Sequence, residues 1–153
     1  MCSSDLSQGC DTCPPADTFA GELAKRSDVL LLSLHVDYWD YLGWKDAYAQ
    51  RAFSERQRAY ARVLAQRFVY TPQMIIDGRV QDVGSDRKAI EHAIAKVRQQ
   101  GGGRLALRQI GHNGKIAVTI ENPAALGVSK SSPAAVWLVV RSEEHTSELQ
   151  SRL

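Results

Sequence analysis

Long hydrophobic runs are missing from this 153-residue sequence. No apolar segment approaches the ~20 residues that a membrane-spanning helix needs, which excludes an integral helical membrane protein. Cysteine is scarce too: the sequence has three, which are too few for a small secreted scaffold held by disulfides. Neither sign of charge is in excess: 19 Lys and Arg face 17 Asp and Glu, so nothing favours nucleic-acid binding. With 44% hydrophobic and 24% charged residues, the composition is typical of a globular domain.

The two ends of the chain have neither helical nor strand periodicity. Residues 142–153 read as the translation of a common sequencing-adapter oligonucleotide, and residues 1–6 read as the translation of its reverse complement. Segments of this kind are set aside in reasoning about a fold, as tags and fusion scars are. We therefore expect both ends to be artefacts outside the fold. Any original signal peptide would have been lost with the true N-terminus.

Two of the three cysteines, Cys10 and Cys13, form a CxxC motif. Two prolines follow, and then Phe19 and Leu23, at positions i and i+4, mark the buried stripe of a short helix. Because proline is tolerated in the first turn of a helix, the thiols lie at the N-terminus of this helix. Unpaired N–H groups there stabilise a thiolate and lower its pKa from ~8.5 into the range of roughly 3.5 to 7.5. The pattern predicts a reactive cysteine pair.

The rest of the first hundred residues alternates between strands and helices. The nearly continuous apolar run at 29–36 suits a parallel strand that is covered on both faces. Apolar residues at helical spacing between 47 and 68 predict a long amphipathic helix with its arginines in solvent. Its expected buried residues are Phe53, Tyr60, Val63, Leu64 and Phe68. In chain order, the predicted elements are a strand at 29–36, an aromatic loop at 37–46, a helix at 47–68, strands at 73–77 and 79–83, and a helix from near Ser85 to the glycines at 101–103.

Beyond these glycines the pattern changes to strands alone. Residues 105–110 and 115–121 flank a Gly-His-Asn-Gly segment, which predicts a β-hairpin. Residues 134–140 offer one more strand. Three strands without a closing partner rarely form a complete domain. We therefore expect a first domain at 7–100 and the start of a truncated all-β domain at 104–141.

Three motifs of the first domain resemble the signatures of the DUF1223 family. They are SQGCDTCPPAD at 7–17, HVDYWDYLGWKD at 35–46 and VYTPQM at 69–74, within a resemblance that runs from residue 7 to about 140. One departure is Ala47, where the family pattern leads us to expect proline. That family is thioredoxin-like, consists mostly of exported bacterial proteins and has no established activity. The resemblance implies an α/β, thioredoxin-like fold and a periplasmic or secreted protein.

The resemblance also predicts a gap in the sheet. In a thioredoxin-like sheet the strand before the CxxC motif is central, and here it would lie between the strands at 29–36 and 73–77. The segment available for this place is Cys-Ser-Ser-Asp-Leu at 2–6, which is short and polar for a buried position. We expect the central strand to be missing. Its two neighbours would then have unpaired backbone edges, and the protein would be poorly stable.

By resemblance to the thioredoxin fold, the CxxC residues take different roles. Cys10, the more N-terminal and exposed cysteine, would attack a substrate disulfide, and Cys13 would resolve the mixed disulfide. A cis peptide bond before Pro72 would turn the backbone at Thr71 towards Cys10, where an extended substrate could pair. These implied roles favour a thiol–disulfide oxidoreductase that acts on protein or small-molecule thiols and disulfides without a metal or other cofactor.

Other interpretations of the same residues remain open. The cysteine pair could be an inert structural disulfide, or it could bind Cu(I), with His35 as the only plausible further ligand in its domain. The chain could also be a non-catalytic, partner-binding domain. The aromatic loop could form a substrate-binding wall or a lid that packs on the core, through Tyr38, Trp39, Tyr41 and Trp44. Of these, Tyr38 and Trp39 are the predicted substrate-binding residues.

Overall fold

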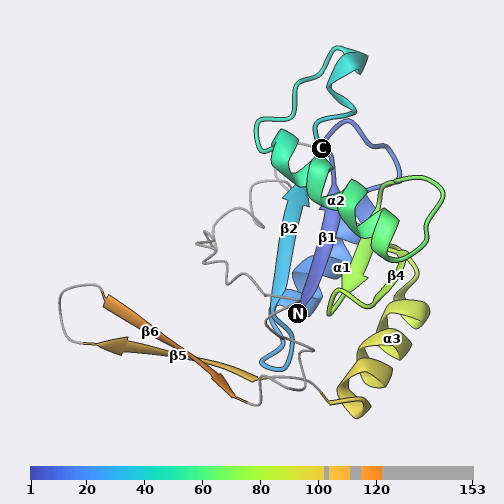
Figure 1. The fold of residues 1–153 in the computed structure, drawn as a ribbon. Coiled ribbons are helices and arrows are strands. Elements are labelled where there is room, and N and C mark those ends of the chain that lie inside the picture. The colour runs from blue at the N-terminus through green and yellow to red at the C-terminus, as the bar shows by residue number, and fades with distance from the viewer. Residues whose placement is uncertain (102–103, 111–114, 122–153) are drawn as a thin grey trace. The chain divides into compact units, whose positions relative to one another are not determined.

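The computed structural model describes residues 1–101, 104–110 and 115–121 (Figure 1). The chain divides into two compact units, Met1–Val97 and Arg98–Val140. The elements up to residue 101 are, in chain order, strand β1 (Cys2–Leu6), helix α1 (Pro14–Ala24), strand β2 (Leu31–His35), the 3₁₀ turn η1 (Asp40–Leu42), helix α2 (Arg51–Val63), strands β3 (Gln73–Ile76) and β4 (Val80–Val83), and helix α3 (Arg87–Gln99). Strands β5 (Arg104–Ile110) and β6 (Lys115–Glu121) follow.

Four strands of the first unit form one mixed sheet in the order β2-β1-β3-β4. Strand β1 is parallel to β2 and antiparallel to β3, and β3 is antiparallel to β4. Figure 1 shows α1 and α2 on opposite faces of this sheet. The arrangement is the thioredoxin-like α/β fold that the sequence predicts, with the strand before the CxxC motif in the centre.

The expectation that this central strand is missing is wrong. Residues 2–6 pair on both sides: Ser4, for example, lies opposite Ser33 of β2 and Met74 of β3. Backbone N–H and C=O groups form such ladders whatever the side chains are, so a polar segment can occupy the position. The adapter match concerns the origin of these residues, whereas their conformation is that of a regular strand. The edges of β2 and β3 that face this central position are therefore paired.

The main apolar core lies on the sheet face that α1 and α3 cover. It includes Cys2 of β1, whose thiol is free and buried. The predicted apolar stripe of α3 is confirmed, because its four residues all lie in this core. The buried members of the core are Cys2, Phe19, Ala20, Leu23, Leu31, Met74, Ile76, Ile90, Ala93, Ile94 and Val97.

The opposite face of β1 carries a buried carboxyl group. Asp5 is fully buried, and neither of its oxygens makes a hydrogen bond within the described residues. The guanidinium of Arg56, on α2, has its Nη1 3.7 Å from Oδ1 of Asp5, which is too far for a hydrogen bond. Burial raises the pKa of Asp5 to about 7, and the positive charge of Arg56 offsets only part of this effect. The polar composition of β1 therefore has an energetic cost.

Helix α2 is shorter than predicted and buries a different face. Its buried side chains are Ser54, Gln57 and Ala61, whereas Val63 and Phe68, expected in the core, are exposed. The reason is that the sheet presents the polar side chains of Ser3, Asp5 and Gln73 to α2. For the same reason Arg56 is not in solvent with the other arginines: its Nη2 donates to Ser3 Oγ at 3.0 Å.

In the second unit, β5 and β6 form an antiparallel pair, as the hairpin prediction requires. The register places Leu107 opposite Val118. The strand predicted at 134–140 and the adapter-like segment at 142–153 lie outside the described residues.

Candidate functional site

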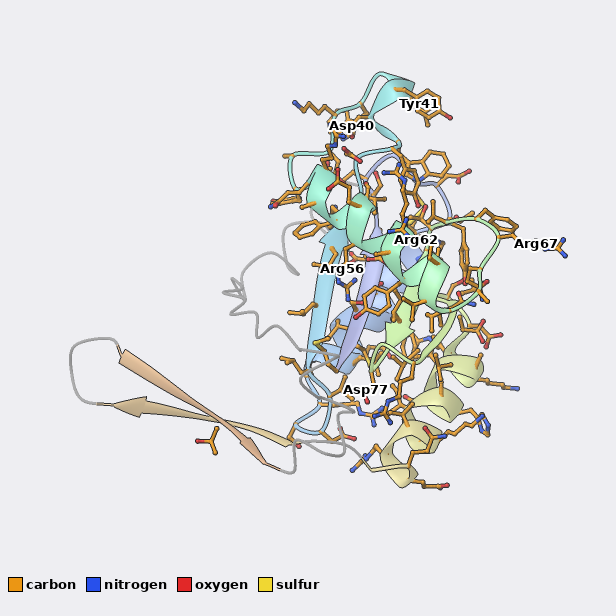
Figure 2. The ribbon with its side chains drawn as sticks, viewed as in Figure 1. Asp40, Tyr41, Arg56, Arg62, Arg67 and Asp77 are labelled. Atoms are coloured by element: carbon orange, nitrogen blue, oxygen red, sulfur yellow. A yellow bond between two sulfur atoms is a disulfide. The ribbon has the colours of Figure 1, made fainter. Side chains whose placement is uncertain are left out.

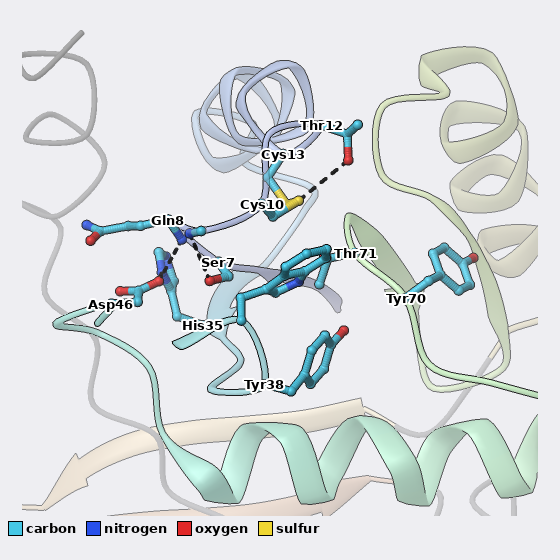
Figure 3. Close-up of a disulfide and its surroundings, with 12 residues drawn as sticks. Ser7, Gln8, Cys10, Thr12, Cys13, His35, Tyr38, Asp46, Tyr70 and Thr71 are labelled. Carbon is cyan, nitrogen blue, oxygen red and sulfur yellow. Dashed lines mark hydrogen bonds and ion pairs between the residues drawn. A yellow bond between two sulfur atoms is a disulfide. The ribbon is translucent and has the colours of Figure 1, made fainter. Parts of the chain in front are cut away.

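The CxxC motif closes a disulfide at the N-terminus of α1 (Figure 3). Cys13 is the residue that caps the helix, and its carbonyl accepts a hydrogen bond from the N–H of Asp17 at 3.0 Å. The N–H of Cys13 in turn donates to the carbonyl of Cys10 at 3.2 Å. Pro14 and Pro15 have no N–H and so cannot donate hydrogen bonds to the sulfur atoms. The first turn therefore favours negative charge on sulfur mainly through the helix dipole. The predicted position of the cysteine pair at a helix N-terminus is therefore confirmed.

Both sulfur-bearing residues are buried, which corrects the expectation that Cys10 is the more exposed one. Cys10 is 3% exposed and Cys13 is 4% exposed. They form a small apolar cluster with Leu6 and Ala16, and Trp39 packs against it. The Thr12 hydroxyl lies 3.5 Å from the Cys10 sulfur. In this state the disulfide presents little surface to a partner.

The loop before β3 lies close to the first turn of α1. The peptide bond between Thr71 and Pro72 is cis, as expected. Gly84, at the end of β4, fits between the loop and the helix: a Cβ at this position would lie 3.2 Å from the Cβ of Ala16 and 3.3 Å from that of Pro72. Its N–H also donates to the Pro72 carbonyl at 3.0 Å. Sequence reasoning missed Gly84, since a single glycine after a strand has no distinctive pattern.

The aromatic loop divides into an inner and an outer part. Trp39 lies inward, and its indole N–H donates to Thr71 Oγ1 at 2.8 Å. Tyr38 lies beside it, and burial raises the pKa of its hydroxyl to about 12. Tyr41 and Trp44, by contrast, are 78% and 59% exposed, and Tyr41 stands at the tip of the loop in Figure 2. Of the four aromatic residues considered as a wall or lid, Trp39 therefore packs against the disulfide cluster and Tyr38 lies beside it, whereas the other two are exposed.

A buried carboxylate connects this loop to the CxxC segment. Asp46 Oδ2 is 2.7 Å from Nδ1 of His35, at the end of β2, and it also accepts the N–H of Gln8 at 2.8 Å. Its other oxygen accepts the N–H of Tyr48 at 2.9 Å. Burial raises the pKa of the Asp46 carboxyl, but the hydrogen bonds from His35, Gln8 and Tyr48 outweigh it and hold the pKa below its usual value. One carboxylate thus ties three segments together.

The sequence suggests only a metal-ligand role for His35, and it does not single out Asp46. Within the described part of the chain, no three His, Cys, Asp or Glu side chains come together as a metal site would require. In the same part, no helix has the length and apolar character that crossing a membrane demands. What the structure brings together is the Cys10–Cys13 disulfide, Trp39 and the Thr71–Pro72 loop.

Comparison with solved structures finds a protein of similar sequence and fold. A crystal structure of a protein from Agrobacterium tumefaciens is similar to this chain, with 40% sequence identity and a TM-score of 0.67. The similarity covers 72% of this chain and 51% of the other, so this chain spans about half the length of that protein. Among curated proteins no match is found.

The family comparison covers nearly the whole chain. Residues 6–151 match the family described as "Protein of unknown function (DUF1223)". The matched range includes Leu6 of β1 and most of the adapter-like segment at 142–153. Together with the three motifs and the thioredoxin-like sheet, this match shows that the chain belongs to the DUF1223 family.

Proposed function

We propose that this protein is a thiol–disulfide oxidoreductase that acts through Cys10 and Cys13. The observation that carries the proposal is the position of their disulfide, at a helix N-terminus and in one cluster with Trp39, which is hydrogen-bonded to Thr71. A helix N-terminus favours the thiolate that exchange chemistry requires. The adjoining loop residues supply an aromatic ring and a backbone segment with which a substrate could interact.

The proposed exchange is reversible and transfers two electrons. In the reducing direction, the Cys10 thiolate attacks one sulfur of a substrate disulfide, and the other substrate sulfur leaves as a thiolate that takes up a proton. The Cys13 thiol then loses its proton and attacks the sulfur of Cys10. This step breaks the mixed disulfide, releases the second substrate thiol and leaves the Cys10–Cys13 disulfide. The oxidising direction runs through the same steps in reverse.

The substrates we propose are protein or small-molecule thiols and disulfides, met in the periplasm or outside the cell. A closed disulfide persists more readily in such oxidising surroundings than in the cytosol. Because Cys10 and Cys13 are buried, a substrate has to displace the ring of Trp39 or the Thr12 side chain to reach the sulfur atoms. Tyr38, Trp39, Thr71 and Pro72 are the residues we assign to substrate binding.

The proposal is tested by thiol trapping across a graded series of redox buffers. After alkylation in denaturant, the oxidised protein should carry one label, on Cys2, and the reduced protein three. We expect the pair to equilibrate within the range of about −120 to −270 mV of known exchange proteins. Cys10→Ser should abolish the reduction of insulin disulfides, whereas Cys13→Ser should accumulate a mixed disulfide.

Two results would contradict this function. One is a pair that neither exchanges with glutathione nor turns over insulin, which would make the disulfide structural. The other is stoichiometric uptake of Cu(I) by the reduced protein without any disulfide turnover, which would make the pair a metal-binding site. As a control, Cys2→Ser leaves both sulfur atoms of the motif in place and should retain turnover.

A further inference from the structure

One buried side chain on α2 connects the two segments that flank the disulfide. Gln57 lies on the inner face of the helix and is 0% exposed. Its Nε2 donates to the carbonyl of Tyr70 at 2.7 Å and to Oε1 of Gln73 at 2.9 Å. Its Oε1 accepts a hydrogen bond from the Tyr38 hydroxyl at 3.1 Å. The amide thus uses both of its N–H groups and its oxygen inside the protein.

The partners of Gln57 stand immediately beside the residues of the candidate site. Tyr70 and Gln73 bracket Thr71 and Pro72 on the two sides. Tyr38 directly precedes Trp39, whose indole N–H in turn donates to Thr71 Oγ1. Gln57 therefore holds the aromatic loop with one end of its amide and the loop before β3 with the other. Figure 3 shows Tyr38, Tyr70 and Thr71 on the same side of the disulfide, with α2 below them.

The chemistry of this position requires an amide. A carboxylate would supply the oxygen but neither of the donors, and an apolar side chain of the same length would leave three polar groups, all at least partly buried, without Gln57 as partner. The network continues on the far side of Gln73, whose Nε2 donates to Oε1 of Gln81 at 2.9 Å, and the Tyr70 hydroxyl also donates to this oxygen. The loop before β3 is thus fixed to β4 as well as to α2.

We propose that Gln57 is a positioning residue that sets the spacing between Trp39 and the Thr71–Pro72 loop, and so shapes the surface on which a substrate meets Cys10. This inference rests on the proposed exchange function and assigns it a residue far from the CxxC motif in sequence. Gln57 touches neither sulfur atom. Its loss should therefore change how a polypeptide substrate is held and leave the redox properties of the disulfide unchanged.

The test is Gln57→Met, which keeps the length of the side chain and removes all three hydrogen bonds. With insulin as the disulfide substrate, we expect KM to rise about fivefold or more, as the loss of one or two buried hydrogen bonds would produce. The equilibrium constant for exchange with glutathione should stay within about twofold of wild type, because Gln57 does not contact the sulfur atoms. Tyr38→Phe, a milder change in the same network, should raise KM in the same direction.

A second measurement does not depend on turnover. Proton exchange of the Trp39 indole N–H, followed by NMR, should accelerate about fivefold or more in Gln57→Met, because its acceptor Thr71 is no longer held in place. Ile90→Val, a core change in α3 that destabilises the protein without touching this network, serves as the control and should leave this exchange close to wild type.

The outcomes separate the two proposals. If wild type reduces insulin but folded Gln57→Met has an unchanged KM and unchanged Trp39 exchange, the positioning role is overturned and the exchange function stands. If wild type does not react with insulin or glutathione, the exchange function fails. In that case acceleration of Trp39 exchange in Gln57→Met, but not in Ile90→Val, supports the positioning role, and exchange at the wild-type rate overturns it.

Discussion

Replacing Asp5 with leucine is expected to raise the free energy of unfolding by about 4 kcal/mol at about pH 8. The carboxyl lies in the centre of the sheet, makes no hydrogen bond within the described residues, and has its pKa raised by burial from 3.8 to about 7. Roughly three pKa units at ~1.4 kcal/mol each give this figure. In the variant, Arg56 can extend its half-buried side chain to water, so it is not left as an unpaired buried charge. Denaturant unfolding followed by tryptophan fluorescence measures the free energy of unfolding.

The sign of the pH dependence follows from the same shift. Between about pH 4 and pH 7 the folded protein keeps the Asp5 proton while the unfolded chain has lost it, so the folded state binds more protons. The wild-type free energy of unfolding should therefore fall as the pH rises through this window. The stabilisation by Asp5→Leu should grow over the same window and level off above about pH 7.

Asp5→Asn separates charge from polarity. It removes the ionisation but keeps a polar group of the same shape, so its gain over wild type should grow over the same pH window and stay smaller than the gain from leucine by an amount that does not change with pH. A difference between wild type and Asp5→Leu that is the same at about pH 5 and about pH 8 would contradict a buried, raised-pKa carboxyl at this position.

Replacing Asp46 with alanine is expected to destabilise the protein by about 3–5 kcal/mol, because three donors lose hydrogen bonds to one buried carboxylate. The change removes the acceptor for His35, for the N–H of Gln8 and for the N–H of Tyr48, all in the interior of the site. Because Gln8 lies two residues before Cys10, the variant should also be reduced faster by dithiothreitol. Both quantities can be measured on the purified full chain.

Asp46→Asn is the matched variant, because it keeps one acceptor oxygen while it loses the charge and turns the second acceptor into a donor. The pKa of Asp46 is held below its usual value, so its charge stabilises the fold above the ordinary carboxyl range, and this stabilisation is lost as the pH falls through the folded pKa. The gap between wild type and Asp46→Asn should accordingly shrink below about pH 4. Equal stability of the two proteins at about pH 7 would contradict the role of the charge.

Local sequence patterns predicted the elements whose burial depends on their own composition. The apolar run ending at His35, the CxxC helix and the stripe of α3 all follow the rule that apolar periodicity marks a buried face. The Thr71–Pro72 loop was placed by resemblance to known motifs. These features carry their information within a few residues, which is why the position of the disulfide beside the helix could be anticipated.

The failures have a common physical origin. Strand β1 was dismissed because Ser3, Ser4 and Asp5 are polar, yet its place in the sheet depends on backbone hydrogen bonds to β2 and β3. The sequence predicts the wrong buried face for helix α2 because its inner side meets Ser3 and Asp5 of the sheet. Gln57 and Asp46 were overlooked because their partners are distant: the bond between Asp46 and Gln8 joins residues 38 apart in the chain. Such partners are determined by the tertiary structure.

The free thiol of Cys2 has a practical consequence that follows from its place in the central strand. Burial raises its pKa, although the positive N-terminus offsets part of this effect, so the folded protein should resist alkylation at this position. With the other two cysteines joined, it is the single reactive sulfur that opening of the sheet can uncover. Its labelling rate in native buffer therefore reports how often this strand opens to solvent.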